Sequence, residues 1–276
     1  MDVIFAKIIL EDEEEKVITK QDLINEGYDC EIFVNETRLV DNMILKKDNY
    51  IIYILKQKYD NLQNMFNGCS LLTSINLSKF NTDNVTNMSG MFNGCSSLPS
   101  IDLSKFNTEK DRNMNGMFQN CSSLISINLS NFNTNNVTNM GSMFHGCTSL
   151  PSIDLSKFNT NNVNFMNAMF FNCSSLTSIN LSNFNTNNVT HMNGMFYNCS
   201  LLTSMDLSNF NTNNVTYMQK MFEGCSSLTS LNLINFNCDK IDSTEKMSEM
   251  FKGCQYLTDV KFKDFKIRLL IDLKNK

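Results

Sequence analysis

The chain has 276 residues, of which 42% are hydrophobic, and its formal net charge is −5. Residues 1–59 hold 13 acidic and 8 basic residues, and the rest of the chain holds 15 of each. This balance offers no basic patch for nucleic acid or anionic lipid, and no stretch approaches the ~20 apolar residues that span a membrane. We therefore expect neither nucleic acid nor membrane insertion among its interactions.

The first 58 residues form a region of their own, in which short apolar runs alternate with polar residues. The runs predict strands at Val3–Leu10, Val17–Thr19, Glu31–Val34 and Tyr50–Leu55, with a short helix at Gln21–Gly27. This order of elements resembles a small ubiquitin-like β-grasp. A second interpretation, compatible with the first, is a cap that covers the open apolar end of the following repeats.

The opening residues do not resemble a signal peptide. MDVIFAKIIL is apolar but lacks a basic start, and EDEEEK follows it where a cleavage site of small residues would stand. We therefore expect a cytoplasmic location, with a cell-surface location reached by an unrecognised route as the alternative.

A Met-Phe-x-x-Cys box then recurs eight times, with six consecutive steps of 26 residues and a last step of 29. Its cysteines are Cys69, Cys95, Cys121, Cys147, Cys173, Cys199, Cys225 and Cys254. Self-similarity at a fixed period means that one supersecondary unit is stacked repeatedly.

Each repeat has an apolar pattern that changes period in its middle. Residues 85–95 place apolar side chains at helical spacing, and Gly94 before the box cysteine suits a helix stop. Leu98, Ile101 and Leu103 then alternate as in a short strand. We therefore expect an α/β repeat, a right-handed leucine-rich-repeat solenoid with a short strand and a short helix in each coil.

The repeated unit CSSLTSINLSNFNTNNVTNMxxMFxxC resembles the BspA-like leucine-rich repeats of surface proteins over about residues 60–265. The resemblance implies adhesion or protein binding without catalysis. The expected organisation is residues 1–58 as the β-grasp-like or capping domain, 59–265 as about eight coils, and 266–276 as a C-terminal cap.

The methionines, phenylalanines and cysteines of the box form regular ladders, which we interpret as core packing and not as a cofactor site. No C-x-x-C pair occurs, so zinc is not expected. Equivalent cysteine side chains in a ladder run parallel, which disfavours disulfides. We predict buried, reduced thiols, and neither cofactor nor metal.

The outward strand positions are the best candidates for a functional surface. Asn and Asp alternate there, flanked by serines, which favours either a soluble ladder of amide–carboxylate hydrogen bonds or a concave face that binds a protein or a glycan. This face lacks Trp, Tyr and Arg, the usual interface anchors. The candidate residues are Ser100, Asp102, Ser126, Asn128, Ser152, Asp154, Ser178, Asn180, Ser204 and Asp206.

Three further residues depart from the repeat. Asp111 occupies a position that is Val in most repeats, and a buried carboxylate there would need Lys110 or Arg112 as a partner, unless the loop swings outward. His145 and His191 stand alone, so neither indicates general-base catalysis. We expect no catalytic residues, and a non-enzymatic scaffold that binds protein through its concave strands or convex turns. The alternative is a cell-surface adhesin for host or matrix proteins.

Overall fold

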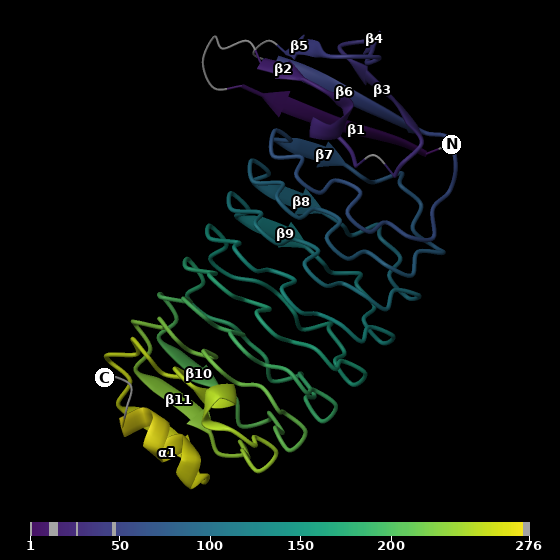
Figure 1. Cartoon of the computed structure of the whole chain (residues 1–276). Helices are drawn as coiled ribbons and strands as arrows, with labels where there is room; N and C mark the ends of the chain where they lie inside the picture. Colours follow the sequence, from purple (N-terminus) through teal and green to yellow (C-terminus); the bar gives the residue numbers. More distant parts are fainter. Residues whose placement is uncertain (1, 11–15, 26, 46–47, 273–276) are drawn as a thin grey trace.

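The computed structural model describes residues 2–10, 16–25, 27–45 and 48–272. After the N-terminal region the chain winds into coils that stack one on the next (Figure 1). Parallel one-residue bridges join equivalent positions of consecutive coils, through Asn61, Asn87, Asn113, Asn139, Phe165, His191 and Tyr217. Each coil is therefore one sequence repeat.

A second parallel ladder joins the short strands of the coils. β8 (Ser100–Asp102) pairs with β9 (Ser126–Asn128), and β10 (Ser204–Asp206) pairs with β11 (Ser230–Leu233). β11 pairs in turn with β12 (Asp259–Phe262). In the two coils between β9 and β10 the equivalent segments, 152–154 and 178–180, are not assigned as strands.

The expected α/β leucine-rich-repeat solenoid is wrong, because the described repeats contain no α-helix. The one α-helix of the described chain, α1 (Phe265–Asp272), follows the last repeat, and the only helical turn within a repeat is the short 3₁₀ helix η2 (Thr244–Met247). The segment expected to be helical is a series of tight turns in which Gly90 has φ +63° and Gly94 has φ +76°. A left-handed residue in the middle of the segment prevents an α-helix from forming.

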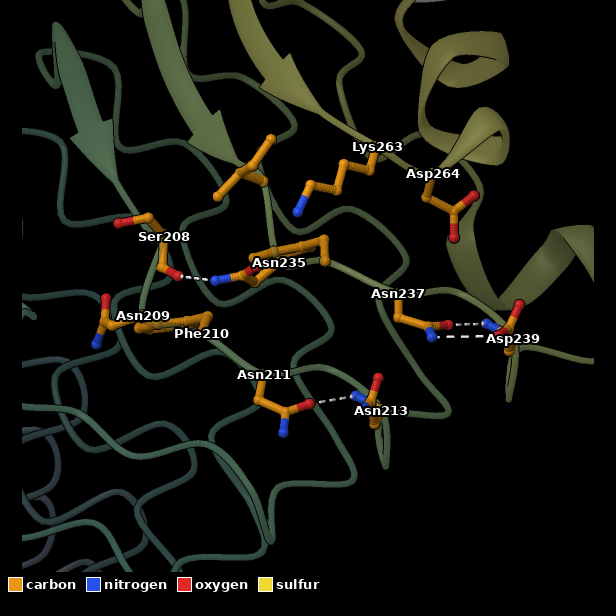
Figure 2. Close-up of a pocket in the computed structure, with 12 residues that line it drawn as sticks. Ser208, Asn209, Phe210, Asn211, Asn213, Asn235, Asn237, Asp239, Lys263 and Asp264 are labelled. Atoms are coloured by element: carbon orange, nitrogen blue, oxygen red, sulfur yellow. Dashed lines mark hydrogen bonds between the residues drawn. The ribbon is translucent and has the colours of Figure 1, made fainter.

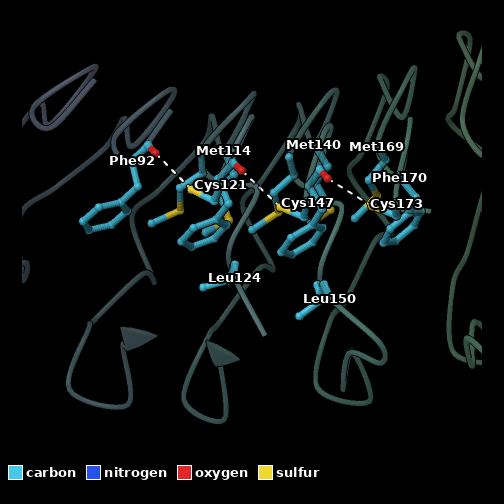
Figure 3. Close-up of a cluster of buried hydrophobic side chains, with 14 of the residues drawn as sticks. Phe92, Met114, Cys121, Leu124, Met140, Cys147, Leu150, Met169, Phe170 and Cys173 are labelled. Atoms are coloured by element: carbon cyan, nitrogen blue, oxygen red, sulfur yellow. Dashed lines mark hydrogen bonds between the residues drawn. The ribbon is translucent and has the colours of Figure 1, made fainter. Parts of the chain in front are cut away.

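The coil interior consists of the predicted ladders, and this prediction is confirmed. The box phenylalanines are buried and stacked, with the Phe92 and Phe118 ring centroids 5.8 Å apart and their planes 3° from parallel. Each box cysteine from Cys95 onward donates its thiol to the box Phe carbonyl of the preceding coil, as from Cys121 Sγ to Phe92 O at 3.1 Å (Figure 3). All ten cysteines of the chain are free and buried.

The N-terminal region is an antiparallel sheet together with a separate pair of short antiparallel strands. The sheet order is β4 (Thr37–Arg38), β3 (Cys30–Val34), β6 (Asp48–Leu55), β1 (Asp2–Ile9) and β7 (Ser74–Asn76). β2 (Lys16–Ile18) pairs separately with β5 (Met43–Leu45). The four predicted strands of this region are present as β1, β2, β3 and β6.

The predicted β-grasp is nevertheless wrong. A β-grasp places its first and last strands side by side and parallel, whereas β1 and β6 pair antiparallel along their whole length, from Asp2 opposite Leu55 to Ile9 opposite Asp48. The helix expected at 21–27 is represented in the described residues only by one 3₁₀ turn, η1 (Lys20–Asp22).

The N-terminal sheet continues into the coils through β7, which belongs to the first coil and pairs antiparallel with β1. Beneath this junction the buried ring of Tyr53 packs edge-on against Phe66 of the first coil, with centroids 5.6 Å apart. At the other end α1 follows the last strand, and its Ile267 is fully buried. The inner face of the N-terminal sheet thus lies against the apolar end of the first coil.

Candidate binding face

All ten predicted surface residues are exposed, and they lie on one side of the coils. In β8 the side chains of Ser100 and Asp102 point outward while Ile101 is buried. Parallel pairing sets Ser100 beside Ser126 and Asp102 beside Asn128, and the same register joins Asp206 to Asn232. We call these outward positions, together with Ser74 and Asn76 of β7, the strand face.

The carboxylates of the strand face also hold the local turns. Asp102 Oδ1 accepts a hydrogen bond from the backbone N–H of Ser104 at 2.9 Å, and Asp154 accepts the same bond from Ser156. These backbone and hydroxyl hydrogen bonds lower the pKa of both carboxyl groups. The alternating Asp positions are therefore ionised at neutral pH, and the turn already uses one oxygen of each.

The strand face extends onto the outer surface of the N-terminal sheet. Register places Phe5 of β1 opposite Asn76 and Lys7 opposite Ser74. One continuous cross-strand row then runs over the sheet, and it consists of Arg38, Phe33, Ile52, Phe5 and Asn76. A polar face built from the coils and an apolar face built from residues 2–55 are therefore one surface.

The apolar part of this surface is well exposed. Tyr50 is 62% exposed, Phe5 49% and Ile9 44%, although such side chains are normally covered in a folded protein. We call Phe5, Ile9, Phe33, Tyr50 and Ile52 the apolar sheet patch. The sequence indicates this exposed patch, because β1 is apolar at both alternating sets of positions, and only one set can face the core.

Charged side chains border the apolar sheet patch. Lys7 pairs with Asp48 at 3.1 Å and lies 5.5 Å from the Tyr50 ring centroid. Arg38 pairs with Glu31 at 2.8 Å. An apolar centre with a charged rim is the usual anatomy of a protein interface.

A polar groove of about 680 Å³ lies at the C-terminal end of the stack, where the last coil departs toward α1 (Figure 2). Most of its amides are already used, since Asn235 Nδ2 donates to Ser208 O at 2.6 Å and Asn237 Nδ2 donates to Asp239 Oδ2 at 3.1 Å. The carboxylate of Asp264 accepts from the backbone N–H groups of Cys238 and Lys266. These bonds hold the last coil together and leave few groups free for a ligand.

Asp111 stays inside, and neither predicted partner reaches it. The side chain is fully buried, Oδ1 accepts from the Asn113 N–H at 2.9 Å, and Oδ2 has no hydrogen-bond partner among the described residues. Lys110 instead donates to Asn84 Oδ1 at 2.6 Å, and Arg112 is exposed. Burial raises the pKa of the Asp111 carboxyl group to about 7.

The described part of the chain contains no cluster of three His, Cys, Asp or Glu side chains arranged to hold a metal ion. Among the same residues, no helix has both the length and the apolar character needed to cross a membrane.

Known protein families provide one clear relationship. The family described as "Mycoplasma protein of unknown function, DUF285" matches residues 54–152 and 165–274. No curated protein matches the chain. The resemblance to BspA-like leucine-rich repeats is therefore wrong, since the repeats have turns where that resemblance required helices, and the family that matches is a different one. Because the match covers more than half of the sequence, the chain belongs to the DUF285 family.

Proposed function

We propose that this chain is a non-enzymatic module that binds a protein partner through the strand face, with the apolar sheet patch as its anchor. The observation that carries the proposal is the register of β1 on β7, which makes the two surfaces continuous. Sequence reasoning found no aromatic or Arg anchor on the strand face. Phe5, Tyr50 and Arg38 supply anchors of the types that dominate interface energies.

The apolar sheet patch can contribute a useful part of a binding free energy. An aromatic side chain presents roughly 150–250 Å², so covering the exposed parts of Phe5 and Tyr50 would remove roughly 200 Å² from water. At ~25 cal/mol per Å² this gives about 5 kcal/mol before the costs of association. The Ser and Asn/Asp rows would then add hydrogen bonds to a partner whose position the apolar sheet patch sets.

We also propose that the chain works in a reducing compartment, such as the cytoplasm. Supporting this, none of the ten cysteines is paired, and burial raises the pKa of the box thiols, to about 12 for Cys121 and Cys173. Structural disulfides are rare in reducing compartments. A cell-surface adhesin would require a different cellular setting for the same surface.

The test uses a photo-crosslinking residue at three positions in turn, in the chain expressed in its own cells. Tyr50 and Asn128 report on the proposed surface, and the exposed Asn162 reports on the loops away from the strand ladder. The same partner should be captured from positions 50 and 128 but not from 162. Phe5→Ser combined with Tyr50→Ser in the 128 reporter should lower the yield at least tenfold. Equal capture from position 162, or an unchanged yield in the double variant, would refute the proposal.

A further inference from the structure

Two rows of side chains run along the turn side of the coils, and both change character partway along. Row A follows the one-residue bridges and reads Asn87, Asn113, Asn139, Phe165, His191 and Tyr217. Row B lies six residues further on in each repeat and reads Asn93, Gln119, His145, Phe171, Tyr197 and Glu223. Early coils carry amides at both positions, whereas three consecutive coils in each row carry aromatic or imidazole rings.

The rings of each row stack on one another at the surface. In row B the centroids of His145 and Phe171 lie 4.5 Å apart, and those of Phe171 and Tyr197 lie 4.2 Å apart. In row A the His191 and Tyr217 centroids are 4.6 Å apart. Phe165 is the first ring of row A, and 38% of its surface is exposed. Stacking covers the ring faces, so the rows present mainly ring edges outward.

The strip between the rows is built from small residues and amides. Its residues are Asn167, Ala168, Asn193 and Gly194, and the Phe171 ring lies so close to Gly194 that an added Cβ there would be 3.2 Å from Phe171 Cδ2. We call the six rings of rows A and B, together with this floor, the turn-side strip.

The side-chain amides of the strip are unusual because they make no hydrogen bonds within the described chain. Within the described chain the side chains of Asn167 and Asn193 make no hydrogen bond, and Gln219 Oε1, at the equivalent position of the next coil, is shielded from solvent without a partner. Elsewhere equivalent amides are bonded, as from Asn115 Nδ2 to Gly141 O at 2.9 Å. Gln219 Oε1 is the shielded atom, and its missing partner costs free energy. Asn167 and Asn193 are half-buried, so their amides can be reached by a ligand and are not taken up by the protein.

We propose that the turn-side strip binds an extended, uncharged segment of a partner polypeptide. A side-chain amide offers one carbonyl acceptor and an NH₂ donor, which match the N–H and C=O groups of a peptide backbone. Apolar side chains of the segment would pack against the ring edges of rows A and B. This surface lies on the turns, so the inference is independent of the strand face.

The chemistry of the strip favours a peptide over other ligands. Sugars stack on ring faces, and the faces of Phe171, Tyr197 and His191 are covered by their neighbours. Nucleic acid and acidic peptides need free cations. The cations nearest the rings are Lys220, 6.0 Å from the Tyr197 centroid, and Lys246, 4.9 Å from the Tyr217 centroid. Both are already paired, Lys220 with Glu223 and Glu249 and Lys246 with Asp242.

The repeat itself offers matched variants, because early coils carry Asn in both rows. The row A variant combines Phe165→Asn, His191→Asn and Tyr217→Asn, and the row B variant combines His145→Asn, Phe171→Asn and Tyr197→Asn. A third variant, Asn193→Ala, removes one amide and leaves every ring in place. Urea midpoints verify that each variant folds.

The experiment is selection of a random 12-residue peptide library on phage against the full chain carrying Phe5→Ser and Tyr50→Ser, which removes the anchors of the apolar sheet patch, followed by affinities of the selected peptides by calorimetry. Peptides rich in uncharged apolar residues should be enriched. Each row variant should weaken their binding at least tenfold and Asn193→Ala at least threefold, whereas restoring Phe5 and Tyr50 should leave it unchanged. Three outcomes overturn the proposal: no peptide is enriched, the row variants bind equally well, or a glycan array in place of the peptides gives the ring-dependent binding.

Discussion

Replacing Asp111 by Val should stabilise the protein, and more so as pH rises. Asp111 is fully buried with one oxygen unbonded, and its pKa rises from 3.8 to about 7. Each pH unit of such a rise corresponds to ~1.36 kcal/mol, so ionising the buried carboxyl group costs about 4 kcal/mol. Losing the bond from the Asn113 N–H costs ~1 kcal/mol, which leaves a net gain of about 3 kcal/mol above pH 7.

The sign follows from proton binding. Below about pH 4 the carboxyl group is protonated in both the folded and the unfolded state, so it contributes no pH dependence. Between about pH 4 and pH 7 only the unfolded state loses its proton, and the native protein loses stability as pH rises. Above about pH 7 both states are ionised and the full penalty is present. Asp111→Val lacks this carboxyl group, so its gain in unfolding free energy over the native chain should grow between about pH 4 and pH 7.

The assay is urea unfolding at pH 4.5, 6 and 8, followed by far-UV circular dichroism and by tyrosine fluorescence, because the chain has no Trp. The difference in unfolding free energy between Asp111→Val and the native chain should increase by about 3 kcal/mol from the lowest to the highest pH. Asp154→Asn is the control. Its exposed carboxyl group has a lowered pKa, so the small effect of removing it should have the opposite pH trend. A difference for Asp111→Val that is flat with pH would refute the buried, ionisable carboxyl group.

Two further predictions concern the turns and the thiols. Gly68 and Gly146 have φ +78° and +73°, but a Cβ at Gly68 meets nothing within 4 Å, whereas one at Gly146 lies 2.6 Å from Asn120 Oδ1. Gly68→Ala should therefore cost ~1 kcal/mol from left-handed strain alone, and Gly146→Ala clearly more, in urea unfolding; equal costs would contradict the coil spacing. Native thiols should resist alkylation at pH 8, because burial raises the pKa of Cys121 to about 12. Without reductant, ten alkyl groups should add only after denaturation, as measured by intact mass, and fewer than ten would reveal paired cysteines.

The ladders of the core were predictable because the repeat states them many times over. A side chain that recurs at one position, such as the box Phe and Cys, must occupy the same environment in every coil. The error was the helix. Spacing through 85–95 fits both a helix and a series of tight turns, and the distinguishing signal was the first left-handed position. Gly90 and Gly116 show it, but Ser142, Ala168 and Lys220 take the same conformation with φ between +53° and +60°, and these residues gave no hint of it.

The predicted fold of the N-terminal region was wrong for a different reason. Alternation locates strands but carries no information on their direction, so the antiparallel pairing of β1 with β6 could not be read from the pattern. The apolar residues on both faces of β1 are visible in the sequence, but nothing in the sequence says which face of the strand is covered. Only the pairing of β1 with β7 shows that Phe5 borders the strand face.

The residues that break the repeat matter more for recognition than the repeat itself. Seven consecutive coils with nearly identical faces present the same Ser and Asn/Asp pattern at every second rung, so a partner could bind in several positions two coils apart. Degenerate positions of this kind add little affinity and no specificity. A unique position requires a feature that occurs once. The chain provides two such features, the apolar sheet patch at one end of the strand face and the rings of rows A and B on the turns.

His145 and His191 look uninformative when each is considered alone, because their neighbours lie 26 residues away in sequence. They occupy equivalent positions of consecutive coils with Phe171, Tyr197, Phe165 and Tyr217, and so they are parts of one surface.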